Sequence, residues 1–131
     1  MIVDSSALLA IVLDEPSSAI CLEALLESRL NRMSAATFLE AAIVADRHPD
    51  RRNRSRLDQL IAELGIDVEP VSAHQATIAR EAYRRFGKGS GHPAKLNFGD
   101  CFAYALAQDI DEPLLFVGQD IVHTDVRRVL G

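Results

Sequence analysis

Two acidic residues are notable because each is the only charge within a strongly apolar stretch. Glu40 lies inside residues 35–45, and Asp100 begins residues 100–107. Both stretches favour buried helices, where an unpaired carboxylate costs several kcal/mol or has a shifted pKa. An arginine partner could compensate Glu40, and the positive end of a helix could compensate Asp100. A bound cation would compensate both, so the two residues are candidate metal ligands.

Other acidic residues follow apolar stretches that are typical of buried strands. Asp4 comes directly after residues 1–3, and Asp120 comes after residues 114–117 and a turn glycine. Ligands of open α/β sheets bind at the carboxyl ends of the strands, which makes both residues candidates. Each also has an ordinary interpretation, Asp4 as a helix N-cap and Asp120 as a turn residue. Asp125 could be a fifth acid or an exposed turn or cap residue.

The chemistry of this group depends on the acids acting together. Carboxylates that converge from separate segments are typical ligands of hard divalent cations such as Mg²⁺ or Mn²⁺. Such ions orient phosphate oxygens, activate water and stabilise charge on a leaving oxygen. The four histidines are scattered, and the two cysteines form no pair with zinc spacing. We expect Cys21 and Cys101 to be small core residues in a reducing compartment.

The elements that must position the acids alternate between strands and helices. We expect strands at residues 1–3, 66–71 and 113–117, and a short strand or turn at residues 31–34. Apolar spacing predicts helices at 7–13, 17–29, 34 or 37 to 46, 53–64, 73–86 and 97–109, the first of them capped by Ser5 and Ser6. This alternation predicts an α/β fold, a three-layer α/β/α sandwich with a central, mainly parallel sheet. A length of 131 residues, without a long linker or a repeat, fits one domain over 1–131.

The formal net charge of −5 does not suggest a nucleic-acid binder, so the local distribution of charge matters. One basic segment carries Arg47, Arg51, Arg52, Arg54 and Arg56. A second surrounds a glycine-rich loop at 87–91, with Lys88 and Lys95. Either segment could contact phosphates, and either could be an ordinary solvated helix face or connector. With five Phe and two Tyr in all, no aromatic platform for base stacking is evident.

No apolar run approaches the roughly 20 residues that span a bilayer. The amino terminus begins with a strand-like segment rather than with a basic region and an apolar signal core. We therefore expect a cytoplasmic protein with no membrane contact.

Four segments of the chain resemble the motifs of a known family, in the right order and over nearly the whole length. Residues 1–8 (MIVDSSAL) resemble the opening of PIN-domain ribonucleases, specifically the VapC toxins of toxin–antitoxin pairs. Residues 36–41 (ATFLEA) resemble the second motif, and residues 92–107 (HPAKLNFGDCFAYALA) resemble the third and most specific one. Residues 114–125 resemble the fourth, except that Gln119 and Ile121 stand where the family often has a polar or acidic residue and Phe.

The resemblance implies a PIN domain over residues 1–131 that hydrolyses RNA endonucleolytically with Mg²⁺ or Mn²⁺. It also implies a VapB-like antitoxin as partner and a homodimer. Its catalytic and metal-binding residues would be Asp4, Glu40, Asp100 and Asp120, with Asp125 as a further possibility. The local positive charge, rather than the resemblance, makes Arg47, Arg51, Arg52, Arg54 and Lys88 candidate RNA contacts.

Rival classes fit the residues less well. A dinucleotide-binding module would need a glycine-rich turn after the first strand, and residues 4–7 contain no glycine. A phosphatase with a nucleophilic aspartate would need a second aspartate two residues later, where Ser6 stands. A non-catalytic interaction module with the same fold is a third alternative, which titration with metal would separate from an enzyme.

Overall fold

The sheet at the centre of the molecule is fully parallel. The computed structural model describes residues 1–131 and contains four strands, β1 (Ile2–Val3), β2 (Arg32–Ser34), β3 (Asp67–Glu69) and β4 (Leu114–Leu115). Their order in the sheet is β3-β2-β1-β4, with Ile2 in register with Arg32 on one side and Leu114 on the other. The predicted parallel sheet is confirmed, and the segment at residues 31–34 is a strand.

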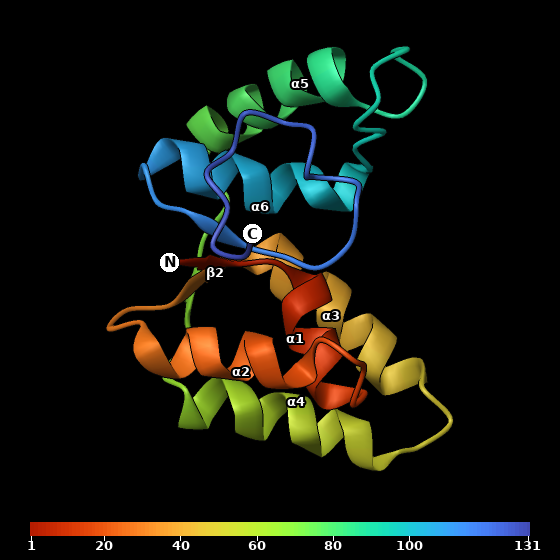
Figure 1. Cartoon of the computed structure of the whole chain (residues 1–131), viewed down its shortest axis with the longest axis vertical. Coiled ribbons are helices and arrows are strands. Elements are labelled where there is room, and N and C mark those ends of the chain that lie inside the picture. Colours follow the sequence, from red (N-terminus) through yellow and green to blue (C-terminus); the bar gives the residue numbers. More distant parts are fainter.

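Helices cover both faces of this sheet (Figure 1). The first four helices lie on one side, and the last two lie on the other. The predicted three-layer sandwich is therefore confirmed. The helices are α1 (Ser5–Val12), α2 (Ser18–Glu27), α3 (Ala35–Arg47), α4 (Arg52–Glu63), α5 (Ala73–Phe86) and α6 (Phe98–Asp109), all with bounds within about two residues of those expected.

Two hydrophobic clusters hold the layers together, and β1 contributes to both. Ile2 belongs to a cluster of 16 buried residues with α5 and α6, whereas Val3 belongs to a cluster of 12 with the other helices. Successive side chains of a strand point to opposite faces of a sheet, so two residues suffice to join both layers. Cys21 and Cys101 are free and buried, as expected of core residues.

The first helix begins earlier than expected because of its cap. Asp4, rather than Ser5 or Ser6, is the N-cap of α1, and its side chain accepts a hydrogen bond from the backbone N–H of Ser6. The interpretation of Asp4 as a helix N-cap is thus confirmed. Neither serine hydroxyl acts as the cap of this helix.

The expectation that the apolar helix α3 is buried on several sides is wrong. Its inner face carries the buried residues Thr37, Ala41 and Ala45, but Leu39 is 58% and Ile43 43% exposed. Of the large apolar side chains, Phe38 packs partly buried against the core, whereas Leu39, Ile43 and Val44 lie on the outer face. None of the six helices is long and apolar enough to cross a membrane.

Candidate active site

Acids from four separate elements meet near the carboxyl edge of the sheet. Asp4 follows β1, Asp120 lies beyond β4, Glu40 is on α3, and Asp100 is in the first turn of α6. The charges of the other three act on the carboxyl group of Asp100 and help to raise its pKa. The structure therefore brings together all four acids that the sequence analysis singled out.

Asp4 is the buried member of the group, with an exposed fraction of 2%. Its Oδ2 accepts hydrogen bonds from the backbone N of Ser6 at 3.1 Å and from Ser6 Oγ at 2.6 Å. Ser6 Oγ in turn accepts from the backbone N of Val117 at 2.9 Å, which ties the acid to the segment after β4. Burial, and to a smaller extent the charge of Glu40, raises the pKa of Asp4. Asp4 Oδ1 is buried without any hydrogen-bond partner.

Glu40 is held by a serine and faces a glycine. Ser5 Oγ donates a hydrogen bond to Glu40 Oε1 at 2.5 Å. A Cβ atom added at Gly99 would lie 1.8 Å from Glu40 Oε2, so the absence of a side chain on α6 makes room for this carboxylate. Glu40 makes no ion pair with an arginine. The alternative of a salt bridge is therefore wrong.

Asn97 connects the two remaining acids. Its backbone N–H donates to Asp100 Oδ2 at 2.9 Å, and its side-chain Nδ2 donates to Asp120 Oδ2 at 3.5 Å. Burial raises the pKa of Asp100 to about 6; the bond from Asn97 opposes this, whereas the charges of the neighbouring acids add to it. Asp120 is exposed. The four acids therefore differ in their exposure to solvent, from buried Asp4 directly after β1 to exposed Asp120 beyond β4.

Asp125 does not join this group. Its Oδ1 accepts from Tyr104 Oη at 2.5 Å and from Gln108 Nε2 at 3.3 Å, while its Oδ2 lies 3.7 Å from Arg85. Burial, followed by the bond to Asp125, raises the pKa of Tyr104 to about 12. Asp125 therefore anchors the carboxy-terminal segment to α6 and α5.

The donor set of the four acids suits a hard cation, because it consists only of carboxylate oxygens. Asp4 Oδ1 is a buried acceptor without a donor, which a cation would satisfy. No three His, Cys, Asp or Glu side chains are close enough to form a ready metal-binding group. The four acids are neighbours, but their like charges repel one another. Binding of a cation would therefore require their carboxylates to move closer together.

The expected basic segment lies away from these acids and is largely paired within itself. Arg52 Nη2 is 2.8 Å from Asp50 Oδ2, and Arg54 Nε is 3.3 Å from Asp46. The guanidinium of Arg52, which bonds to it, lowers the pKa of Asp50 to about 2. Arg47, Arg51 and Lys88 are exposed and make no ion pair. Pairing at α4 favours the interpretation as a solvated helix face for Arg52 and Arg54.

Four residues around the acids were not predicted from the sequence to belong to the site: Ser5, Ser6, Asn97 and Gly99. The serines are interpretable as caps and Asn97 as a helix start, and those local roles conceal their contacts with acids 2 to 35 residues away. No pattern in the sequence marks Gly99, because its role is to leave space for the side chain of Glu40 on another helix.

Comparisons with known proteins agree with this fold. The family model for the PIN domain matches residues 1–127. Ribonuclease VapC28 of Mycobacterium tuberculosis is 52% identical over 130 residues, which cover 99% of this chain and 98% of that protein. The chain therefore belongs to the PIN-domain family, and within it to the VapC ribonucleases.

Solved structures show the same fold at low sequence identity. VapC20 of Mycobacterium tuberculosis, described as a toxin that cleaves the sarcin-ricin loop, superposes with a TM-score of 0.78 at 15% identity, covering 98% of this chain and 97% of that one. A toxin–antitoxin complex from Klebsiella pneumoniae superposes with a TM-score of 0.71 at 16% identity, covering 95% of this chain and 92% of that one.

Proposed function

We propose that this protein is an endoribonuclease that uses Mg²⁺ or Mn²⁺ held by Asp4, Glu40, Asp100 and Asp120. The unpaired Oδ1 of buried Asp4, among three other acids, carries this proposal. The 52% identity to a VapC ribonuclease supports the choice of RNA as substrate. A metal ion at these carboxylates would activate a water molecule and neutralise charge at the scissile phosphate.

The residues around the acids have positioning roles in this proposal. Ser6 fixes the buried carboxylate of Asp4 through two hydrogen bonds, which leave Oδ1 free. Ser5 holds Glu40 toward the same region. Asn97 orients Asp100 and Asp120 from the first turn of α6. Each acid therefore has at least one donor that limits its rotation before any substrate arrives.

The central experiment compares cleavage and metal binding of the wild type and Asp4→Asn. We expect cleavage of RNA by the wild type, its loss in EDTA, and its loss in Asp4→Asn. Calorimetric titration with Mn²⁺ should show binding to the wild type and much weaker binding to Asp4→Asn. Asp58→Asn, which changes an exposed acid on α4, is the matched control and should behave as the wild type. Cleavage that persists in EDTA and in Asp4→Asn would refute the mechanism.

We also propose that the protein acts in the cytoplasm as the toxin of a toxin–antitoxin pair and is neutralised by a VapB-like antitoxin. The structural likeness to a chain of a toxin–antitoxin complex, together with the 52% identity to a VapC ribonuclease, supports this partner. Expression of the protein alone should arrest growth, and co-expression of its antitoxin should restore growth and yield a co-purifying complex. Growth arrest by Asp4→Asn as strong as by the wild type would contradict a toxin that acts through cleavage.

We further propose that two copies of the chain associate through the outer face of α3. Three large apolar side chains on this face, Leu39, Ile43 and Val44, are 58%, 43% and 40% exposed. Contiguous exposed apolar surface of this kind is unusual on a monomer. Sedimentation analysis should give a dimer for the wild type and a monomer for Ile43→Asp. A monomeric wild type at micromolar concentration would contradict this assembly.

A further inference from the structure

A mostly apolar cleft of about 380 Å³ lies between α5 and α6. Its walls carry three aromatic rings, Tyr83, Phe98 and Phe102, together with Arg80 and Arg84. Phe98 stands two residues before Asp100, and Cys101, directly after Asp100, also lines the cleft. Anything bound in the cleft would therefore touch the first turn of the helix that carries Asp100.

Two of these aromatic rings are unusually exposed. Phe98 has an exposed fraction of 75%, and Tyr83 one of 43%. Phe98 meets Phe102 edge to face, with ring centroids 5.0 Å apart, so one face of its ring is left uncovered by that contact. A ring so exposed contributes little to the folded chain. It is available to stack with a planar ligand.

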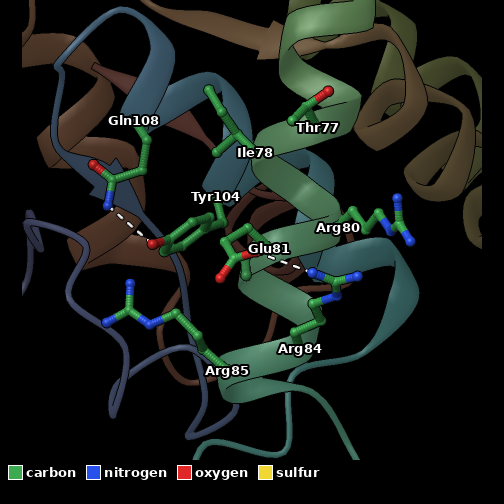
Figure 2. Close-up of a pocket in the computed structure, with 9 residues that line it drawn as sticks. Thr77, Ile78, Arg80, Glu81, Arg84, Arg85, Tyr104 and Gln108 are labelled. Atoms are coloured by element: carbon green, nitrogen blue, oxygen red, sulfur yellow. Dashed lines mark hydrogen bonds and ion pairs between the residues drawn. The ribbon is translucent and has the colours of Figure 1, made fainter.

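The two arginines of the cleft have little negative charge to balance them. Arg80 makes no ion pair or hydrogen bond, and Arg84 meets only Glu81, at 3.7 Å and with both side chains 62% exposed. Figure 2 shows the neighbouring groove and places both guanidinium groups on the side of α5 away from Tyr104 and Gln108. These arginines therefore supply positive charge to the α5 wall of the cleft, which attracts a polyanion that the four acids themselves would repel.

We propose that this cleft binds one nucleotide of single-stranded RNA next to the scissile phosphate. The base stacks on Phe98 and Tyr83, and the adjoining phosphates pair with Arg80 and Arg84. This inference rests on the proposed function. It also replaces the expectation that no aromatic platform for base stacking is evident, because two of the few aromatic residues, Phe98 and Tyr83, line one cleft and are exposed.

The charge of the cleft favours RNA over a second copy of the chain as its occupant. A protein surface that covered the cleft would have to desolvate two arginines, which is costly unless acids meet them. Phosphates pair with arginine in a bidentate manner and leave the charges solvated at the rim. The exposed face of α3, on the other side of Phe98, has no such arginines and is the better candidate for self-association.

Measuring the affinity for short RNA with and without bases distinguishes base stacking from contacts with the RNA backbone. The probe is an eight-nucleotide single-stranded RNA of mixed sequence, compared with the same backbone carrying abasic sites. Fluorescence anisotropy would be measured with wild type in EDTA and with Asp4→Asn, since neither should cleave the probe. Phe98→Ala and Tyr83→Ala should each bind the intact RNA about tenfold more weakly and the abasic RNA unchanged. Leu26→Ala on α2, also an exposed apolar residue, is the matched control and should change neither.

The arginines are tested by the dependence of binding on salt. Arg80→Ser combined with Arg84→Ser should weaken both probes and lower the slope of log Kd against log salt by about 1 to 1.5, as expected for two lost phosphate contacts with a single strand. Arg29→Ser, an exposed arginine at the end of α2, is the control and should leave the slope unchanged.

Three results would overturn the inference. Equal binding of both probes by Phe98→Ala, Tyr83→Ala and the wild type, with cleavage intact, would overturn the nucleotide site and leave the proposed function standing. A change from dimer to monomer in sedimentation for Tyr83→Ala, with unchanged RNA binding, would assign the cleft to a second copy. A wild type that neither binds the probes nor cleaves RNA would overturn the proposed function itself, together with this site.

Discussion

The helices α3 and α6 are similar in their apolar composition but differ in their surroundings. Each is apolar and carries one acid of the site, Glu40 or Asp100. α6 lies against the sheet and under α5, and six of its residues are buried in an unbroken apolar stretch from Ala103 to Ala107 and at Cys101 (Figure 1). α3 buries only Thr37, Ala41 and Ala45.

The difference shows that a lone charge in an apolar stretch has more than one structural meaning. In α6 the apolar residues form the core, and the acid lies partly buried in the first turn of the helix. In α3 mainly small residues, with Phe38, form the contact with neighbouring elements, and Leu39, Ile43 and Val44 remain outside. The two helices approach each other closely where Gly99 faces Glu40, and this contact unites the two acids.

The largest expected effect is on stability and contrasts two leucines. Leu106 on α6 is 1% exposed, and Leu39 on α3 is 58% exposed. Leu106→Ala should lower the free energy of unfolding by about 2–5 kcal/mol, because it leaves a cavity in the core. Leu39→Ala should change it by less than about 0.5 kcal/mol. Urea denaturation at low protein concentration, where association through α3 contributes little, measures both. Similar losses for the two variants would contradict the proposed difference between the helices.

The next prediction concerns the contact between the helices. Gly99→Ala would place a Cβ atom at the position of Glu40 Oε2, and the flexible carboxylate would move. We expect cleavage to fall about 100-fold, or about 2.7 kcal/mol in transition-state free energy, with little loss of stability. In a Glu40→Ala background the same change should raise stability by about 1 kcal/mol, because alanine is the better helix former. Unchanged cleavage by Gly99→Ala would show that Glu40 does not need its present position.

The order of the elements and the four candidate acids could be predicted from the sequence. The hydrogen bonds that position these acids could not. Asp4, Glu40 and Asp100 stand out against apolar neighbours, which is a local signal. The contacts from Ser5 to Glu40 and from Asn97 to Asp120 join residues 35 and 23 positions apart, and no local pattern encodes them. The outward direction of Leu39 was also unpredictable, because it depends on how much of α3 its neighbours cover.

A smaller effect follows from the raised pKa of Asp100. The folded-state pKa of about 6 lies above the ordinary value of 3.8, so the folded protein holds this proton more tightly than the unfolded chain. Ionisation of Asp100 therefore destabilises the metal-free fold at neutral pH. The shift corresponds to at most about 3 kcal/mol, which screening of a partly exposed carboxyl reduces to about 1 kcal/mol. Asp100→Asn should raise stability in EDTA by about that amount.

The stability of this variant relative to the wild type should depend on pH. Below about pH 4 the carboxyl group of Asp100 is protonated in both the folded and the unfolded protein. Asp100→Asn and the wild type should therefore be equally stable there. The advantage of the variant should grow as the pH rises from 4 to 6 and then remain constant. Denaturation at several pH values in EDTA measures it. An advantage that is largest at acidic pH would contradict the burial of this carboxyl group.

The smallest expected effect contrasts the residues that cap the two helices. Ser34 caps α3 through a bond from the backbone N of Ala36, whereas Asn97 precedes α6 and also reaches Asp120. Ser34→Ala and Asn97→Ala should each lower stability by about 1 kcal/mol. Only Asn97→Ala should also reduce cleavage, by about threefold to tenfold, because Asp120 loses its donor and moves more freely. Thermal unfolding and initial cleavage rates measure the pair. Equal cleavage by the two variants would mean that Asn97 acts on helix stability alone and that Asp120 needs no fixed orientation.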